Sequence, residues 1–355
     1  MRKNIKNICC SLMVMVLAVS TTEIQAGNPD RKGQAGASEL LINPWARSSG
    51  FANANSACSK GLESSYMNIA GTAFTKKTEI LFTNTNWLKG SDVKINALGI
   101  TQKVGESGVL GLNLVAMSLG DIAITTTDQP EGKIGNFSPR FMNLGLSYAK
   151  EFSHSIYGGI NVKLVSESVA DLKATGVAFD AGIQYVTGKR DNMHFGISLK
   201  NVGAPLKFSG DGFAVRATLA SNTSSTLTVE QRSAKFEMPS LINIGGAYDL
   251  YTSATDTVHK ITIAYTFVSN SFTSNQHCLG LEYGFRKMFM LRGGYVFEKD
   301  LFNDELKTTL LTGPTAGATV EVPLGKNGTT FAVDYSYRAS NPFQGSHSIG
   351  FRLNL

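Results

Sequence analysis

The chain ends on Ser348-Ile349-Gly350-Phe351-Arg352-Leu353-Asn354-Leu355, and this ending is the most informative part of the sequence. Apolar side chains alternate with small or polar ones up to the last residue, as in a β-strand with one apolar face. The ends of soluble domains usually fray, whereas a closed membrane barrel needs an ordered strand at its end. The ending therefore favours an outer-membrane β-barrel, and the alternative is the edge strand of a soluble sheet.

The start of the chain has the features of an export signal. Three basic residues precede the short apolar run Leu12–Ala18, and Ile24-Gln25-Ala26 provides a small-residue cleavage site. The apolar run is too short to cross a bilayer as a helix. We therefore interpret residues 1–26 as a cleaved signal peptide.

Composition and charge narrow the class further. The chain has 33 Lys and Arg against 27 Asp and Glu; without residues 1–26 the counts are 30 and 26, a net charge of about +4. The basic residues form no patch with interleaved aromatics, so we expect no nucleic-acid partner. No later segment has the roughly 18 apolar residues of a transmembrane helix. A membrane-spanning chain of this kind is expected to be a closed barrel.

From Thr78 onward the sequence alternates with period 2 between turn signals. The alternation is weakest over 93–104, where it breaks between Ala97 and Leu98. We predict about fourteen strands: 78–88, 93–104, 108–119, 141–152, 155–167, 174–187, 192–201, 239–251, 259–269, 276–286, 288–298, 315–324, 329–338 and 346–355. The prediction is an all-β fold, a transmembrane antiparallel barrel over residues 78–355.

The lengths of the connections agree with this fold. Short turns, such as Gly105–Ser107 and Gly325–Gly328, alternate with long connections. With both chain ends in the periplasm, the long connections Gly120–Arg140, Val202–Met238 and Lys299–Gly313 all lie outside the cell. Short periplasmic turns and long outer loops are typical of bacterial barrels.

Residues 27–77 lack the alternation. Residues 27–38 are polar and rich in Gly, and short helices are possible near 37–41 and 64–73. About fifty residues are enough to fill a barrel lumen, so we predict a plug-like N-terminal segment. The alternative is an extension that stays in the periplasm.

The sequence contains no recognisable catalytic or metal-binding motif. The histidines are isolated, and no nucleophile lies in a recognisable elbow. We therefore expect neither enzyme activity nor a cofactor or metal. The cysteines left after processing, Cys58 and Cys278, could form a disulfide or remain free thiols. Lumen-facing charges could pair into stabilising networks: Asp180, Glu282, Arg292, Asp334 and Arg352.

Several stretches together resemble the PorV/PorQ family of Bacteroidota outer-membrane proteins. They are Asn84–Leu88, Ile95–Gly99, Gly120–Ile122 with Thr125–Asp128, Gly176–Tyr185 and Leu199–Phe208, in the family's order over nearly the whole mature chain. Asn43–Gly50 is similar to the family's small-residue segment. Asn68-Ile69-Ala70-Gly71 aligns with the family's Asn-Pro-Ala-Gly turn, with Ile in place of Pro, so Asn68, Ala70 and Gly71 are the plug-motif residues.

The resemblance implies a FadL-type barrel of fourteen strands in the type IX secretion and gliding system. The implied partners are the giant translocon barrel and secreted proteins with a C-terminal signal domain, beside the membrane lipids. The sequence of the N-terminal region differs from that of PorV itself. The chain could therefore be a paralogue that has a different set of cargo proteins or a different partner.

Three functional readings follow from the sequence. The leading one is a shuttle barrel that binds secreted proteins through its outer loops, above all Val202–Met238, which is rich in Ser, Thr and Gly. The contact residues predicted on these loops are Asp121, Thr127, Asp128 and Phe213. The alternative is FadL-like transport of a hydrophobic small molecule, which predicts an apolar lumen pocket and a lateral opening. The third is a soluble secreted sandwich.

Overall fold

The structure is a computed structural model. It describes residues 31, 33–219, 222–251, 258–299, 301, 303, 310–325, 328–340 and 343–355. The predicted signal peptide, residues 1–26, lies outside these described residues.

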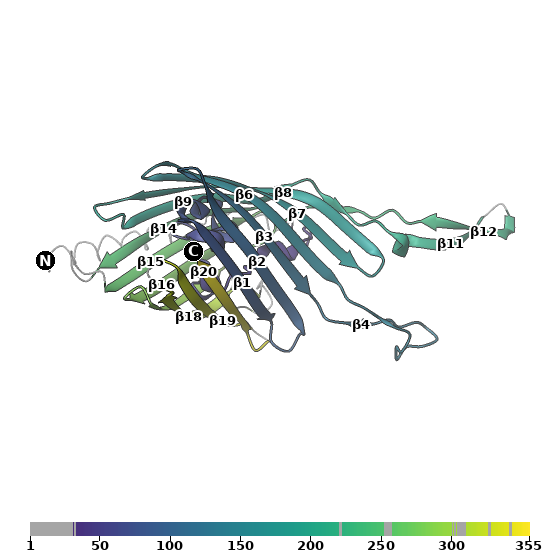
Figure 1. Cartoon of the computed structure of the whole chain (residues 1–355). Coiled ribbons are helices and arrows are strands. Elements are labelled where there is room, and N and C mark those ends of the chain that lie inside the picture. Colours follow the sequence, from purple (N-terminus) through teal and green to yellow (C-terminus); the bar gives the residue numbers. More distant parts are fainter. Residues whose placement is uncertain are drawn as a thin grey trace.

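Fourteen antiparallel strands form a closed barrel in which each strand pairs with its neighbours along the chain (Figure 1). The last strand pairs with the first, with Phe82 opposite Phe351, so the alternating C-terminus closes the sheet as predicted. The predicted strand ends lie within two residues of the observed ones. The strands are β1 (Thr78–Trp87), β2 (Val93–Val104), β3 (Gly108–Ser118), β6 (Arg140–Ser153), β7 (Ile156–Val169), β8 (Leu172–Thr187), β9 (Met193–Gly203), β14 (Leu241–Tyr251), β15 (His259–Asn270), β16 (Gln276–Phe285), β17 (Phe289–Glu298), β18 (Gly313–Pro323), β19 (Thr330–Arg338) and β20 (Ser346–Asn354).

The two faces of the wall differ in polarity. Leu146 points outward and is 60 % exposed, whereas its neighbour Ser147 points into the lumen and is buried. Outward apolar residues suit lipid, and an inward polar face suits a wet or protein-filled lumen. Strand β2 departs from this pattern because Ile95 and Ala97 face the lumen and pack against protein there. This inward apolar pair explains why the alternation fails near Leu98.

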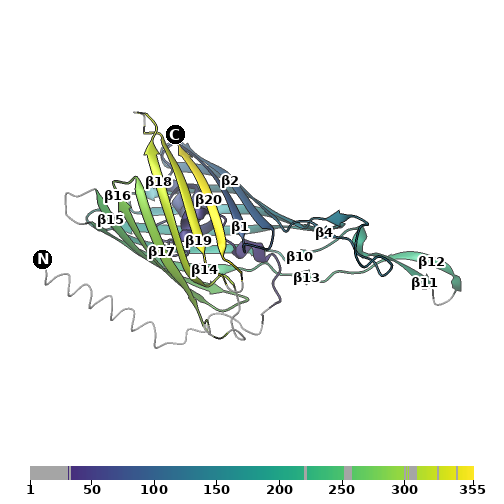
Figure 2. The same ribbon diagram turned by 90° about the horizontal axis from the view of Figure 1, so that it is seen from below.

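The N-terminal segment lies inside the barrel, where it is drawn in purple (Figures 1 and 2). The helix α2 packs on β17–β20, and η4 packs on β6, β7 and β8. The segment therefore forms a plug, as predicted. Its short helices are η2 (Ser38–Leu41), α2 (Ala46–Gly50), η3 (Gly61–Glu63), α3 (Ser64–Met67) and η4 (Ile69–Phe74). No helix in the described part of the chain is long and apolar enough to cross a membrane.

Glycines in the wall let the plug backbone approach closely. A Cβ atom added at Gly196 in β9 would lie 2.8 Å from the Ala57 Cα atom, and one at Gly294 in β17 would lie 2.7 Å from the Ala52 Cβ atom. Glycine inside a strand often marks such an approach of another backbone. The wall is therefore shaped to the plug that it encloses.

The long loops extend from one end of the barrel in both views (Figures 1 and 2). Because bacterial barrels have short turns on the periplasmic side and long loops on the outer side, we assign this end as extracellular. They contain structure that the sequence did not reveal. The described part of the long connection predicted over Val202–Met238 contains two ribbons, in which cross-strand pairs such as Val215 with Val229 hold the strands together. The loop elements are β4 (Ile122–Ala123), β5 (Asn136–Phe137), β10 (Leu206–Lys207), η5 (Asp211–Phe213), β11 (Ala214–Leu219), β12 (Asn222–Glu230) and β13 (Lys235–Phe236).

Candidate functional site

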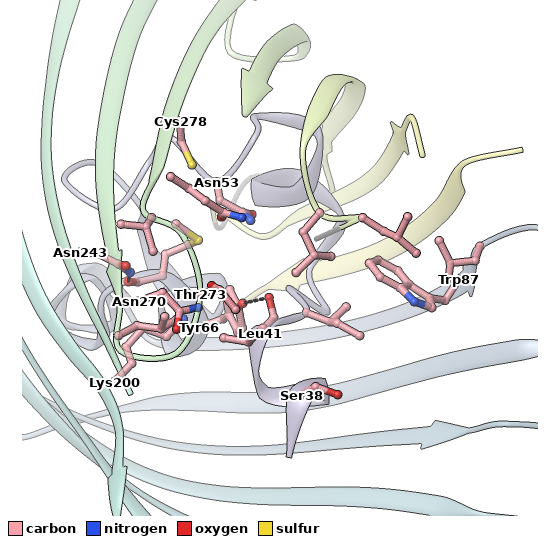
Figure 3. A pocket seen from close by; sticks show the side chains of 18 residues that line it. Ser38, Leu41, Asn53, Tyr66, Trp87, Lys200, Asn243, Asn270, Thr273 and Cys278 are labelled. Atoms are coloured by element: carbon pink, nitrogen blue, oxygen red, sulfur yellow. Dashed lines mark hydrogen bonds between the residues drawn. The ribbon is translucent and has the colours of Figure 1, made fainter. Parts of the chain in front are cut away.

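A cavity of about 360 Å³ lies between the plug and the extracellular half of the wall (Figure 3). The plug forms one side, and residues near the outer ends of the strands form the rest. Cavities of this size hold small organic ligands. The apolar lining residues are Leu41, Ile42, Met67, Trp87, Leu88, Leu241, Val268, Cys278, Leu310 and Leu311, and the polar ones are Ser38, Asn53, Tyr66, Lys200, Asn243, Asn270, Thr273 and Gln276.

Tyr66 lies at the centre of the plug side of the cavity. Its hydroxyl donates a hydrogen bond of 2.6 Å to the carbonyl oxygen of Leu41, and this bond is drawn in Figure 3. Burial raises the pKa of the Tyr66 hydroxyl, which therefore stays neutral at physiological pH. The bond joins two turns of the plug, so it fixes the plug surface that faces the cavity.

Lys200 reaches the cavity because it continues the inward face of β9, on which every second residue from His194 onward is buried. Lys200 and Asn201 lie together opposite Asp180 of β8, where the register shifts, and both side chains are buried. The bulge turns the Asn201 side chain inward beside Lys200, where alternation alone would point it outward. The Lys200 ammonium nitrogen lies 3.4 Å from the centre of the Tyr66 ring. Figure 3 shows Lys200 on the opposite side of the cavity from Trp87.

A buried ionic network holds the plug against the wall. Arg47 of the plug lies 3.1 Å from the Glu282 carboxylate of β16, and the Arg292 Nε atom of β17 lies 2.8 Å from the same carboxylate. Arg292 also donates to Thr319, and Asp334 lies within 3.9 Å of both Arg292 and Arg352. The lumen charges predicted to pair do so. The network ties α2 to one side of the barrel.

A second network lies beside the bulge on the other side of the lumen. Lys163 lies 2.8 Å from the Asp180 carboxylate, which also accepts hydrogen bonds from the Asn161 side chain and the Asn201 backbone. Asn201 in turn donates to the carbonyl oxygen of Pro239. The Asp180 charge is thus fully engaged in holding the bulge together.

Glu39 of the plug lies near the Glu167 carboxylate of β7, and no cation among the described residues forms an ion pair with it. Burial, and next the Glu167 carboxylate of β7, raise the pKa of Glu39 to about 8. Its side chain is 9 % exposed. Burial therefore favours the neutral, protonated form of the Glu39 side chain at this end of the plug.

The plug-motif residues act as an anchor. The Asn68 side chain accepts a hydrogen bond from the Ala70 N–H and donates to the carbonyl oxygens of Ile183 in β8 and Ile197 in β9. Ala70 is fully buried, and a Cβ atom at Gly71 would lie 2.3 Å from the carbonyl oxygen of Ser59. These three residues hold the inner turn of the plug to the wall. They do not line the cavity.

The predicted contact residues lie in two different loops. Asp121 accepts a hydrogen bond from Ser138 at the base of the β4–β5 loop, and Thr127 and Asp128 are exposed in that loop. Phe213 is half-buried in η5, where its carbonyl oxygen accepts a hydrogen bond from the Gln231 N–H. None of the four lines the cavity in the described structure.

The cysteines are not joined. Cys58 and Cys278 are free thiols, and burial raises the pKa of the Cys58 thiol to about 12. Among the described residues, no group of three or more His, Cys, Asp or Glu side chains could hold a metal ion.

The sequence did not predict the cavity. The one signal for it was Lys200, because alternation places this lysine on the lumen face of its strand and no acidic residue was predicted to pair with it.

Comparison with known proteins identifies the fold. No protein-family model and no curated protein matches the sequence, so the PorV/PorQ resemblance has no support from a family match. The structure is similar to the toluene transporter TodX of Pseudomonas putida, with a TM-score of 0.52 and 14% identity over 88% of this chain and 97% of TodX. It is also similar to a TodX deltaS2S3 mutant, described as a monoaromatic hydrocarbon channel, with a TM-score of 0.51 and 13% identity over 87% of this chain and 98% of that one.

A FadL homologue of Pseudomonas aeruginosa has a TM-score of 0.48 and 11% identity over 87% of this chain and 96% of its own. At these identities the likenesses to TodX show the fold alone. The chain is a closed barrel of fourteen strands with a fold similar to that of TodX, and it is an integral protein of the outer membrane.

Proposed function

We propose that this barrel binds a hydrophobic small molecule in its extracellular cavity and carries it across the outer membrane. The observation that carries the proposal is the cavity of about 360 Å³ between plug and wall, lined mainly by apolar side chains. An apolar lining favours an apolar ligand, because the ligand leaves water and enters a preformed site. The fold of a toluene transporter supports the same reading.

The route out of the cavity is constrained by the wall. All fourteen strands are hydrogen-bonded to both neighbours, and the strand registers shift between β6 and β7 and between β8 and β9. The lateral opening expected for this function is not seen in the described part of the wall. In this proposal, passage therefore requires a movement of the plug or a local parting of strands.

The proposal is tested by the permeability of intact cells. We expect expression of the protein in a bacterial host to raise, several-fold, the initial rate at which N-phenyl-1-naphthylamine enters and fluoresces. Thr273 lines the cavity from the β15–β16 loop, so Thr273→Trp fills the cavity and should abolish the increase. Thr127→Trp places the same side chain on an exposed loop and should leave it unchanged. Equal rates with and without the protein would refute transport of this probe class.

A second candidate is a subunit of the type IX secretion system that binds the translocon or the C-terminal domain of cargo. We propose it because the β11–β12 ribbon projects far from the barrel and exposes Val215, Leu227 and Val229 on one face (Figure 1). An isolated two-stranded ribbon is marginally stable in water, so a partner would stabilise it. Asp121, Thr127, Asp128 and Phe213 remain the proposed contact residues.

This candidate has its own test. Residues 212–232 are replaced by a short turn above the β10–β13 pair, and the tagged protein is purified from outer membranes in mild detergent. Co-purification of a giant barrel or of proteins sharing a C-terminal domain with the intact protein, and its loss in the variant, would support the role. Recovery of the barrel alone in both cases would refute it.

A further inference from the structure

A line of cationic side chains crosses the outer surface of the wall near its extracellular end. The cations are Lys94 of β2, Arg140 of β6 and Lys173 of β8, and alternation in each strand places all three on the outward face. Ser118 of β3 pairs with both Lys94 and Arg140. Ser168 of β7 pairs with both Arg140 and Lys173. The three cations therefore belong to one line of paired residues across strands that lie side by side in Figure 1.

This line carries no acidic residue between β20 and β8. Its other members are His347, Asn86, Ser118 and Ser168. In the described part of the chain, none of the three cations forms an ion pair with a carboxylate. The acids nearest to them in sequence lie in the connections beyond the strand ends, and they are Asp92, Asp121 and Asp171. The positive charges on this face are therefore left to a partner from outside the chain.

The spacing of the cations is regular. Lys94 and Arg140 are two strands apart, and so are Arg140 and Lys173. At the usual distance between neighbouring strands, each step is about 10 Å. A partner with two anionic groups at this separation can contact two of the cations at once.

Polarity changes in steps along these strands. Two residues from the cation toward the centre of the membrane, the outward side chain on β2 and on β8 is a neutral hydrogen-bonding one, and two residues further it is apolar and exposed. The order is Lys94, Asn96, Leu98 on β2 and Lys173, Thr175, Val177 on β8. A lipid has the same order, from its phosphate through its polar linkage to its acyl chains.

The other arc of the wall differs at the same end. On β16, β17 and β19 the outward residues nearest this end are aromatic, and they are His277, Phe297 and Tyr337. Aromatic residues at the interface anchor a barrel in lipid whatever the charge of the headgroup. The cations of the β2–β8 arc add a charge preference to this general anchoring, because basic clusters beside a membrane attract anionic lipids.

We propose that Lys94, Arg140 and Lys173 bind a phosphorylated glycolipid of the outer leaflet. Its phosphate groups contact neighbouring cations of the line, and its acyl chains lie along Leu98 and Val177. A headgroup with one phosphate reaches one cation, whereas two phosphates on a pair of sugars reach two. The site is on the outside of the barrel, so the inference is independent of the proposed function and of the cavity.

The test measures lipid binding by native mass spectrometry of the purified full-length protein in a non-ionic detergent. The probe is lipid A with two phosphates, and the comparison lipid is the same molecule after removal of both phosphates. We expect the lipid A to bind at least tenfold more tightly. The triple variant Lys94→Gln, Arg140→Gln, Lys173→Gln should lose this preference. Arg140→Gln alone should weaken lipid A binding roughly fivefold, because Arg140 has a cation on each side.

The matched control removes the same charge from outer loops. Lys133, Lys207 and Lys235 are exposed there, and changing all three to Gln should leave the preference intact. Loss of the preference in this loop variant would show an effect of net charge and overturn the proposal.

Three other results would also overturn it. Equal binding of lipid A with and without phosphates by the unchanged protein would remove the role of the phosphates. Equally tight binding of phosphatidylglycerol would remove the requirement for a glycolipid. A preference retained by the triple variant would show that the lipid binds elsewhere on the barrel.

Discussion

At the scale of the residue, replacing a buried arginine should change the free energy of unfolding by an amount that depends on whether the arginine has carboxylate partners. Arg292→Met leaves Glu282 and Asp334 short of a partner, so we expect a loss of about 3–5 kcal/mol in the free energy of unfolding. Arg338→Met removes a cation whose Nε and Nη2 atoms have no hydrogen-bond partner among the described residues, so the change should lie within about 1 kcal/mol or stabilise the free protein. Urea unfolding in phospholipid vesicles measures both. Equal losses would contradict this account of Arg338.

Glu39 should make stability depend on pH. Its pKa is raised from 4.5 to about 8 in the folded chain, so between these values the native state binds more protons than the unfolded state. Stability is then greatest at low pH and falls as pH rises through this window, by about 1.4 kcal/mol per unit of pKa difference for this group. Glu39→Gln should flatten that part of the unfolding curve. A variant with unchanged pH dependence would show that Glu39 does not titrate there.

At the scale of the element, the fit between plug and wall should be sensitive to single glycines. Gly196→Val drives a side chain into the plug backbone at Ala57, so we expect a displaced plug and a higher ion conductance in planar bilayers. Gly246→Val is the matched control, because the nearest atom to a Cβ atom there is 3.9 Å away. Equal conductance of the two variants would refute close seating of the plug.

The elements also show what the sequence could predict. The strand positions could be predicted from the alternation of apolar and polar residues. In a barrel wall, side chains that face lipid alternate with side chains that face a mostly polar lumen, so the pattern repeats every two residues. The plug followed from the absence of alternation. The bulge at Lys200–Asn201 could not be predicted, because it depends on Asp180 and Pro239, which are distant in sequence. The ribbons within Val202–Met238 were not predicted, because β10 and β13 have only two residues each and β12 is rich in Ser and Thr.

At the scale of the whole molecule, the cavity exists only when barrel and plug are assembled. Its lining comes from the plug, from several strands and from outer loops, for example Tyr66, Asn243 and Thr273. No single stretch of sequence contains the site, so alternation and motifs could indicate a lumen but not its shape. The predicted loop contacts and the cavity are separate regions of the molecule, and they belong to different functional proposals.

The most direct test of the central claim is whether the purified barrel holds a hydrophobic molecule in this cavity. Tritium-labelled N-phenyl-1-naphthylamine is titrated into the detergent-solubilised protein, and bound ligand is counted after rapid gel filtration. The account predicts saturation at one ligand per barrel, loss of binding in Thr273→Trp and retention in Thr127→Trp. Binding that does not saturate, or that is the same in all three proteins, would contradict it.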